Sequence, residues 1–441
     1  MTGHELLHRL SKASSQDLLA SLYGASQVDE AIGRYKVLLQ ATLKDFPEAE
    51  GDIHVFTAAG RTELGGNHTD HNYGKVLAAS IQLDALAFAS PRNDTRVIFR
   101  STGYPDVVVD IADTSPKPEE RGTTEALIRG IAAEFKKRGV QVRGFTANAA
   151  STVLSGSGLS SSAAVEVLFG TIFDRLYGEG NRSAVEIAQI GQKAENLYFG
   201  KPCGLMDQVA CASGGAVAID FKNPSEPFVR QVPFDPSISG YALCVVDTGG
   251  SHADLTDEYA AVPAEMRTIA AHFGKPVLRD IEKGDFIQAI PALRNSAGDR
   301  AILRALHFFA ENDRVDAMLQ AITANHGAKT SAERKKSMEH FLDLVNESGN
   351  SSWELLQNVF SIKSFTEQGP SLALAMTREF IREIGSGACR VHGGGFAGTI
   401  QVYIPLDSVD AYRAYMEGPF GKKAVTQLRI RPIGAAELHF E

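Results

Sequence analysis

A loop of small residues opens directly into an apolar helix near the middle of this chain. Residues 156–164 read Gly-Ser-Gly-Leu-Ser-Ser-Ser-Ala-Ala, and apolar side chains recur at helical spacing from Val165 to Phe173. The first turn of a helix leaves backbone N–H groups unpaired and carries partial positive charge, which suits a phosphate group. Small residues let that phosphate approach the backbone, and the serine hydroxyls add hydrogen bonds or a ligand for Mg²⁺. A flexible loop with an ordinary helix N-cap is the alternative interpretation.

Length and charge narrow the class of protein. The 441 residues exceed what one hydrophobic core usually organises, so we expect two domains. A formal net charge of −9 without a basic cluster disfavours a nucleic-acid surface. No apolar run has the length of a membrane span, and the first residues lack the pattern of a signal peptide. We therefore expect a cytoplasmic protein, not bound to a membrane, with a small-molecule partner. The four cysteines include no C-x-x-C pair and are predicted to be reduced.

The distribution of apolar residues predicts the order of the elements. Residues 1–50 have helical spacing and are predicted to form a helical extension. Strands are predicted at 53–56, 76–79, 97–99, 107–111, 216–221, 241–246 and 399–404. A capping box at Ser183 opens a helix that Gly200 is expected to end, with Glu195 beside its buried stripe. The second half is mainly helical, at 261–273, 286–293, 300–312, 315–324 and 332–345. The polar stretch 223–236 is the predicted boundary between α+β domains at 51–230 and 237–441.

Four polar clusters that contain glycine need a common explanation. The first, residues 60–74, begins Gly-Arg-Thr-Glu-Leu-Gly-Gly-Asn-His-Thr-Asp-His-Asn, and the second is the loop at 156–164. The third is Cys-Gly-Leu-Met-Asp-Gln at 203–208, and the fourth is Val-His-Gly-Gly-Gly-Phe-Ala-Gly at 391–398. One such motif is weak evidence, but four in this order are strong.

Together these clusters resemble the galactokinases, within the wider GHMP family of small-molecule kinases. Residues 60–72 match most of the pattern Gly-Arg-x-Asn-Leu-x-Gly-Glu-His-Thr-Asp-Tyr-Asn, and residues 156–163 match the phosphate loop Gly-x-Gly-Leu-Ser-Ser-Ser-Ala. The resemblance covers about residues 51–404. It implies an α+β fold of two lobes with the active site in the cleft between them. It also implies transfer of the γ-phosphoryl group of ATP to the anomeric hydroxyl of galactose.

The resemblance also implies a role for each matched residue. Asp207 would lie beside the anomeric hydroxyl as base or orienting group, with Arg61 near it and near the transferring phosphate. Such a guanidinium keeps a carboxylate ionised and offsets phosphoryl charge. Mg²⁺ would be associated with Ser162 and Glu195, whose hard oxygen atoms suit that ion. The nucleotide phosphates would meet Gly156, Ser157, Gly158, Leu159, Ser160, Ser161 and Ser162, and the sugar would meet Asn67, His68, Asp70, Gly204 and Tyr259.

Structural explanations stay open for several of these residues. Asp207 and Arg61 also fit a structural ion pair, Glu195 a solvent-facing acid and Tyr259 ordinary core packing. His68 either contacts the ligand or braces a turn, and a metal site made with His71 would lack a third ligand nearby. The glycine turn at 393–398 resembles a motif that packs beside the phosphate loop, although backbone angles alone could require its glycines.

Two departures affect the expected sugar. Asn67 replaces a glutamate that in the family accepts a hydrogen bond from the C6 hydroxyl of galactose, and Glu63 stands where asparagine is usual. Because an amide is uncharged and both donates and accepts, we expect tolerance of changes at C6, and we expect Asn67→Glu to sharpen the preference for galactose. Galactose is the leading substrate. The alternatives are a modified hexose such as galacturonate or N-acetylgalactosamine, and a non-catalytic regulator that binds sugar and ATP.

Overall fold

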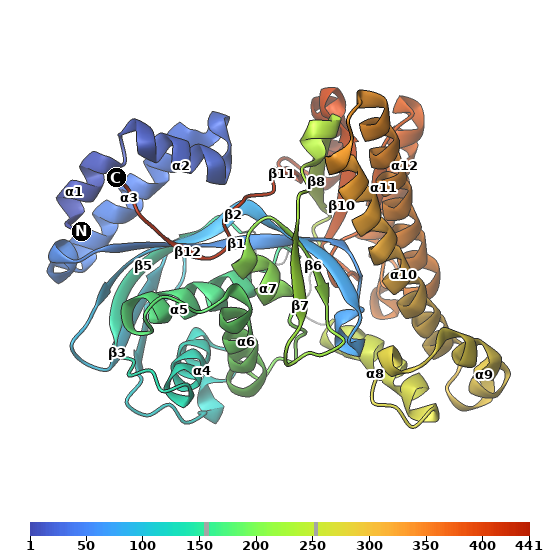
Figure 1. Ribbon diagram of the computed structural model, residues 1–441, viewed down its shortest axis with the longest axis horizontal. Helices are drawn as coiled ribbons and strands as arrows, with labels where there is room; N and C mark the ends of the chain where they lie inside the picture. The colour runs from blue at the N-terminus through green and yellow to red at the C-terminus, as the bar shows by residue number, and fades with distance from the viewer. Residues whose placement is uncertain (154–157, 251–254) are drawn as a thin grey trace.

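The computed structural model describes residues 1–153, 158–250 and 255–441, and it has two lobes built on separate sheets (Figure 1). The first sheet has eight strands among these residues, in the order β12-β1-β2-β5-β3-β4, with β6 paired to β2 and β7 paired to β6. The bounds of its strands are β1 His54–Gly65, β2 Lys75–Pro91, β3 Arg96–Ser101, β4 Val107–Asp110, β5 Phe145–Ser151, β6 Ala216–Asp220, β7 Phe228–Val232 and β12 Ala436–Leu438. All neighbouring pairs are antiparallel except β3 with β5.

Helices cover both faces of this first sheet. Along β2 the side chains alternate, so that Phe88 faces one core and its neighbour Ala87 faces the other. One face packs against α4 Thr124–Lys137, α5 Ser161–Tyr177, α6 Ala184–Ala194 and α7 Met206–Ser213. The opposite face carries the N-terminal helices α1 Gly3–Arg9, α2 Ala13–Tyr23 and α3 Val28–Asp45 (Figure 1). The predicted helical extension is thus confirmed, and it is part of the first lobe's core.

A buried carboxylate ties the N-terminal helices to this sheet. Asp84 on β2 accepts hydrogen bonds from Tyr23 Oη and Arg34 Nη2, each at 2.6 Å, and from Arg431 Nη1 at 3.1 Å. Asp84 has no solvent-exposed side-chain surface. Burial raises its pKa, but the two guanidinium groups outweigh burial and hold the pKa below the usual value. The N-terminal helices and the segment around Arg431 are therefore both bound to the Asp84 carboxylate.

The second lobe is a four-stranded sheet between helical layers. Its described strands follow the order β11-β8-β10-β9 and are all antiparallel, with bounds β8 Tyr241–Asp247, β9 Ala388–Val391, β10 Thr399–Pro405 and β11 Val425–Leu428. One face packs on α12 Gly369–Ile384 and α13 Val409–Phe420, and the other on α11 Ser331–Ser351. The remaining helices are α8 Thr256–His272, α9 Lys283–Ser296 and α10 Asp299–Gly327. The two lobes together confirm the predicted α+β fold.

Two predicted elements differ from the structure in their extent. The strand predicted at 53–56 continues as β1 to Gly65, so the first residues of the first polar cluster lie on this strand. The two helices predicted at 300–312 and 315–324 form the single helix α10, because the polar residues between them lie within a continuous helical segment. The predicted boundary 223–236 contains β7, which extends the first sheet by pairing with β6.

The last strand also returns to the first lobe. In β12, Leu438 pairs with Val55 of β1. Residues 436–438 thus complete the first sheet although they lie in the second predicted domain, 237–441. No helix in the described part of the chain is both long enough and apolar enough to cross a membrane.

Candidate active site

The first and third polar clusters meet through an ion pair between Arg61 and Asp207. Arg61 lies on β1, where the pairing with β2 shifts register just after Ala59, and such irregularities re-aim a side chain. Asp207 lies in the first turn of α7. Arg61 Nε and Nη2 donate to the two carboxylate oxygens, each at 2.8 Å. This bidentate geometry fixes the orientation of both groups.

Asp207 is held ionised and within reach of a ligand. Burial raises its pKa, but the charge and hydrogen bonds of Arg61, the hydroxyl of Ser160 and the charge of Lys201 outweigh burial and lower the pKa. The position in the first turn of a helix favours the anion further. The side chain of Asp207 is 35% exposed, whereas that of Arg61 is 6% exposed. The carboxylate can therefore accept a hydrogen bond or a proton from a molecule outside the protein.

The described part of the predicted phosphate loop lies beside this pair. Gly158 O accepts a hydrogen bond from Arg61 Nη1, and Leu159 O accepts one from the Arg61 backbone N–H at 3.1 Å. Ser160 is the N-cap of α5 and has a left-handed backbone with φ of 59°. Backbone strain of this kind is concentrated at functional sites. Ser161 and Ser162 occupy the first turn of α5, while Gly156 and Ser157 lie outside the described residues.

The fourth cluster packs against the second, as the sequence pattern predicts. A Cβ on Gly158 would lie 3.2 Å from His392 Nδ1, and one on Gly393 would lie 3.5 Å from Gly158 O. The His392 ring is buried and hydrogen-bonded to Thr62 on β1 at 3.0 Å and to Thr399 on β10 at 3.1 Å. The described part of the predicted phosphate loop therefore lies against elements of both lobes.

Three of the predicted sugar residues converge on the glycine turn. Asn67 Nδ2 donates to Gly393 O at 2.6 Å, His68 Nε2 donates to Gly394 O at 2.9 Å, and Tyr259 Oη donates to Gly395 O at 3.0 Å. Burial lowers the pKa of His68 to about 3, so the ring is neutral and its proton lies on Nε2. The hydrogen bond to Gly394 is what the turn-bracing interpretation of His68 requires.

Asn67 is fully buried and directed at protein groups. Its Nδ2 also donates to the two oxygens of Glu63, at 3.1 and 3.3 Å, and its Oδ1 accepts from Asn358 Nδ2 at 2.8 Å. Glu63 is equally buried and forms an ion pair with Arg390 on β9. The two positions that depart from the galactokinase pattern are thus hydrogen-bonded to each other.

Asp70 and Gly204 are brought into contact. A Cβ on Gly204 would lie only 1.8 Å from Asp70 Oδ2, so no side chain fits there without moving the carboxylate. The other oxygen, Oδ1, accepts from the backbone N–H of His71 at 2.9 Å. Gly204 shortly precedes α7, which places the Asp70 carboxylate close to the segment that leads to the catalytic candidate Asp207.

Glu195 lies in a π-helical turn, Glu195–Phe199, that Gly200 ends with a φ of 85°. The interpretation of Glu195 as a solvent-facing acid is wrong, because its side chain is only 4% exposed. Its Oε1 lies 3.2 Å from Lys201 Nζ, and its Oε2 accepts from Gln208 Nε2 at 3.0 Å.

A second buried carboxyl group, that of Glu166, contacts the same side-chain amide of Gln208 as Glu195 does. Gln208 Nε2 donates to Glu166 Oε2 at 2.9 Å, and Glu166 Oε1 is buried without a partner. Burial, then the charge of Glu195, raises the pKa of Glu166 well above its usual value. In the described residues no group of three or more His, Cys, Asp or Glu side chains is arranged to hold a metal ion. A nucleotide-bound Mg²⁺ needs only one or two protein oxygens, so Glu195 and the exposed Ser162 are a suitable donor set.

Helix α10 supports the first cluster from the second lobe, which the sequence analysis did not predict. His307 Nε2 donates to Asn67 O at 2.8 Å, Glu311 accepts from the Gly66 N–H at 3.0 Å, and Asn312 accepts from the Lys75 N–H at 2.7 Å. The available signal was a histidine and a glutamate four residues apart within a helix whose neighbouring turns carry buried apolar residues.

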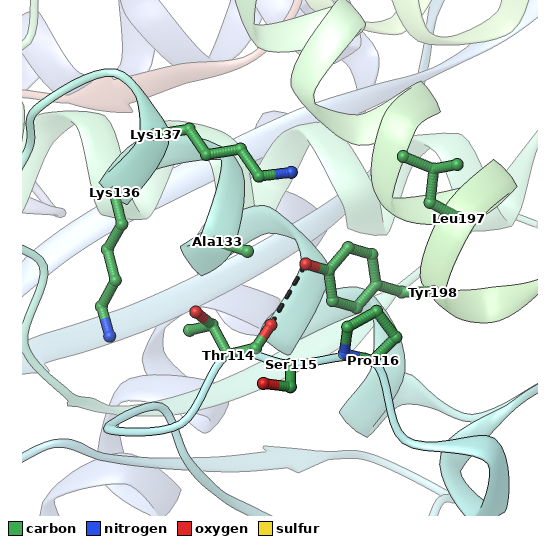
Figure 2. A pocket seen from close by; sticks show the side chains of 8 residues that line it. All are labelled: Thr114, Ser115, Pro116, Ala133, Lys136, Lys137, Leu197 and Tyr198. Atoms are coloured by element: carbon green, nitrogen blue, oxygen red, sulfur yellow. Dashed lines mark hydrogen bonds between the residues drawn. The ribbon is translucent and has the colours of Figure 1, made fainter.

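A separate shallow cavity of about 520 Å³ lies between α4 and the turn after α6 (Figure 2). Its lysines already have partners: Lys136 Nζ donates to Ile111 O at 2.6 Å and Lys137 Nζ to Glu134 Oε1 at 2.7 Å. The residues that line it are Thr114, Ser115, Pro116, Ala133, Lys136, Lys137, Leu197 and Tyr198. None of the predicted site residues is among them.

Comparisons with known proteins agree with this fold and identify its family. The family model for the GHMP kinases N-terminal domain matches residues 126–215, which include the phosphate loop and Asp207. The galactokinase galactose-binding signature matches residues 44–91, which include Arg61 and Asp70. The fold matches the crystal structure of Lactococcus lactis galactokinase complexed with galactose, with a TM-score of 0.74, 24% identity and coverage of 91% of this chain and 100% of that one. Mevalonate kinase of Methanococcus jannaschii matches with a TM-score of 0.58, 13% identity and coverage of 86% and 99%.

Fold and site together define a GHMP-type small-molecule kinase. Galactokinase of Streptomyces coelicolor is 32% identical over 390 residues, covering 87% of this chain and 92% of its own length. Galactokinase of Streptomyces lividans is 30% identical over 380 residues, covering 84% and 87%. The chain belongs to the galactokinase family.

Proposed function

We propose that this protein transfers the γ-phosphoryl group of ATP to the anomeric hydroxyl of galactose. The observation that carries the proposal is the Arg61–Asp207 pair, with an ionised and partly exposed carboxylate beside the N-terminus of α5. Membership of the galactokinase family supports galactose as the sugar. Asp70, Gly204, His68 and Tyr259 are the proposed sugar residues, whereas the Asn67 side chain, also predicted to meet the sugar, is bound to Glu63, Gly393 and Asn358.

Asp207 acts on the attacking hydroxyl. As base it accepts the hydroxyl proton while the sugar oxygen forms a bond to the γ-phosphorus and the bond from that phosphorus to the β–γ bridging oxygen breaks, releasing ADP. As orienting group it accepts a hydrogen bond and aligns the same oxygen. Arg61 keeps the carboxylate ionised in either role, because its guanidinium is bound to both carboxylate oxygens.

The nucleotide phosphates belong at the loop before α5. Backbone N–H groups and serine hydroxyls of the predicted phosphate loop would supply donors to phosphate oxygens, and Gly158 leaves room for their approach. Ser162 and Glu195 would hold Mg²⁺, which supplies positive charge to the β- and γ-phosphate oxygens when bound. Nucleotide binding should weaken when Mg²⁺ is removed.

Replacement of Asp207 tests the proposal. Asp207→Ala and Asp207→Asn should lower turnover by about two to four orders of magnitude while ATP still binds, as is usual for a positioned acid–base group. Asp220→Asn is the matched control, because Asp220 forms an ion pair with Arg279 at 2.8 Å outside the site. Wild-type turnover in folded Asp207→Ala would refute the assignment, and ADP release measured over a panel of hexoses and uronates identifies the sugar.

A further inference from the structure

Lys201 is a cation at the site to which no role has been given. It directly follows the glycine that ends the π-helical turn, and its backbone N–H donates to Glu195 O at 3.2 Å. Its Nζ lies 3.2 Å from Glu195 Oε1. The Lys201 side chain is 61% exposed, whereas that of Glu195 is 4% exposed. The Glu195 carboxylate is therefore a fixed, buried partner, while the ammonium group of Lys201 is accessible to a ligand.

The two cations near Asp207 differ in the donors that they have available. Three nitrogen atoms of the Arg61 guanidinium already donate to Asp207 and to Gly158 O. Lys201 has three N–H donors, one of which is directed at Glu195. Its charge is also one of the influences that lower the pKa of Asp207, after those of Arg61 and Ser160. A triphosphate brings several negative charges, and Arg61 alone offers little further donor capacity to them.

We propose that Lys201 binds the γ-phosphate of ATP: it neutralises Glu195 in the nucleotide-free protein and moves to the phosphate when the nucleotide brings a cation to Glu195. This rests on the proposed function of the site. An ammonium on a flexible four-carbon stem is well suited to such an exchange, because it binds phosphate as a point charge and reorients at little cost. Lys201 then supplies one more positive charge to the phosphoryl oxygens, on which negative charge develops in the transition state.

Equilibrium binding tests the proposal without turnover. Isothermal titration calorimetry would measure the affinities of ADP and of the non-hydrolysable analogue AMP-PNP, each with Mg²⁺ and with EDTA. Lys201→Met should weaken AMP-PNP about 10- to 100-fold, the range for loss of one charge-assisted hydrogen bond, and leave ADP within about threefold. Lys201→Arg should keep most of the affinity. Lys193→Met is the matched control, because Lys193 on α6 is also exposed and its ion-pair partner, at 3.6 Å, is Glu134 on α4 and not Glu195.

Three results would overturn the proposal. The first is wild-type affinity of Lys201→Met for AMP-PNP, and the second is an equal loss of affinity for ADP and AMP-PNP. The third is recovery of AMP-PNP binding in EDTA when Glu195→Gln is added to Lys201→Met, since that would mean that Lys201 only neutralises Glu195. If Lys201→Met does not fold, Lys201→Gln is measured instead. Failure of the kinase assignment is separate, because it would appear as retained turnover in Asp207→Ala.

Discussion

Asn67→Glu is expected to destabilise the fold, and this effect should outweigh any change in sugar preference. The Asn67 amide donates to both Glu63 oxygens and to Gly393 O, and it has no solvent-exposed surface. A glutamate carboxylate at position 67 donates nothing, and it would stand beside another buried carboxylate. Arg390 still donates to Glu63 Oε1, so the acceptors that lose their donor are Glu63 Oε2 and Gly393 O. At about 1–3 kcal/mol for each buried acceptor, and with like-charge repulsion included, we expect a loss of about 3–5 kcal/mol.

The double exchange Glu63→Asn with Asn67→Glu provides the decisive comparison. The double variant again places one amide in contact with one carboxylate, with asparagine at position 63 and glutamate at position 67 as in the galactokinase pattern. We expect the two changes to be non-additive, with a favourable coupling of at least about 1 kcal/mol, because the side chains share a hydrogen bond. Urea unfolding of the wild type, both single variants and the double variant measures this. A single Asn67→Glu variant within about 0.5 kcal/mol of the wild type would show that the side chain is not enclosed as described.

Three further changes have expected outcomes. Ser160→Ala removes a hydroxyl that donates to Asp207 and helps to lower its pKa, so the acid limb of the pH–rate profile should move to higher pH; an unchanged limb would separate that pKa from catalysis. Gly204→Ala would bring a methyl group within 1.8 Å of Asp70 Oδ2 and should raise the KM for galactose more than that for ATP, as steady-state kinetics would show. Asp84, whose pKa is lowered in the fold, stabilises the protein above its unfolded pKa of about 3.9, and this stability is lost as the pH falls through the folded value. Asp84→Asn should therefore be less stable at pH 7 and less sensitive to acid, and equal acid sensitivity in unfolding curves would contradict this.

The sequence predicted local chemistry better than distant pairing. The resemblance of four glycine-bearing motifs to the galactokinases predicted that Arg61, Asp207 and the phosphate loop lie together, and Arg61 is hydrogen-bonded to both Asp207 and Gly158. The capping box at Ser183 and the helix stop at Gly200 were confirmed, since both depend on a few adjacent residues. Strand β7 was missed because its exposed, polar edge position resembles a linker.

Contacts between lobes could not be predicted from local pattern. The Glu63–Arg390 pair joins residues 327 positions apart, and nothing near either residue indicates the other. The same holds for the support of the sugar motif by His307 on α10. Asn67 was interpreted as a specificity residue from its position in a motif, and only the fold shows that its amide is enclosed by protein groups.

The return of β12 to the first sheet has a consequence for how the chain folds during synthesis. Strand β1 emerges from the ribosome before its partner at Ala436–Leu438, which is made much later, after a delay on the order of tens of seconds at usual elongation rates. During that time one edge of β1 has unpaired backbone groups, which is the kind of surface that pairs with other chains. The nascent first lobe is therefore a natural client for chaperones, although the finished protein buries the same edge.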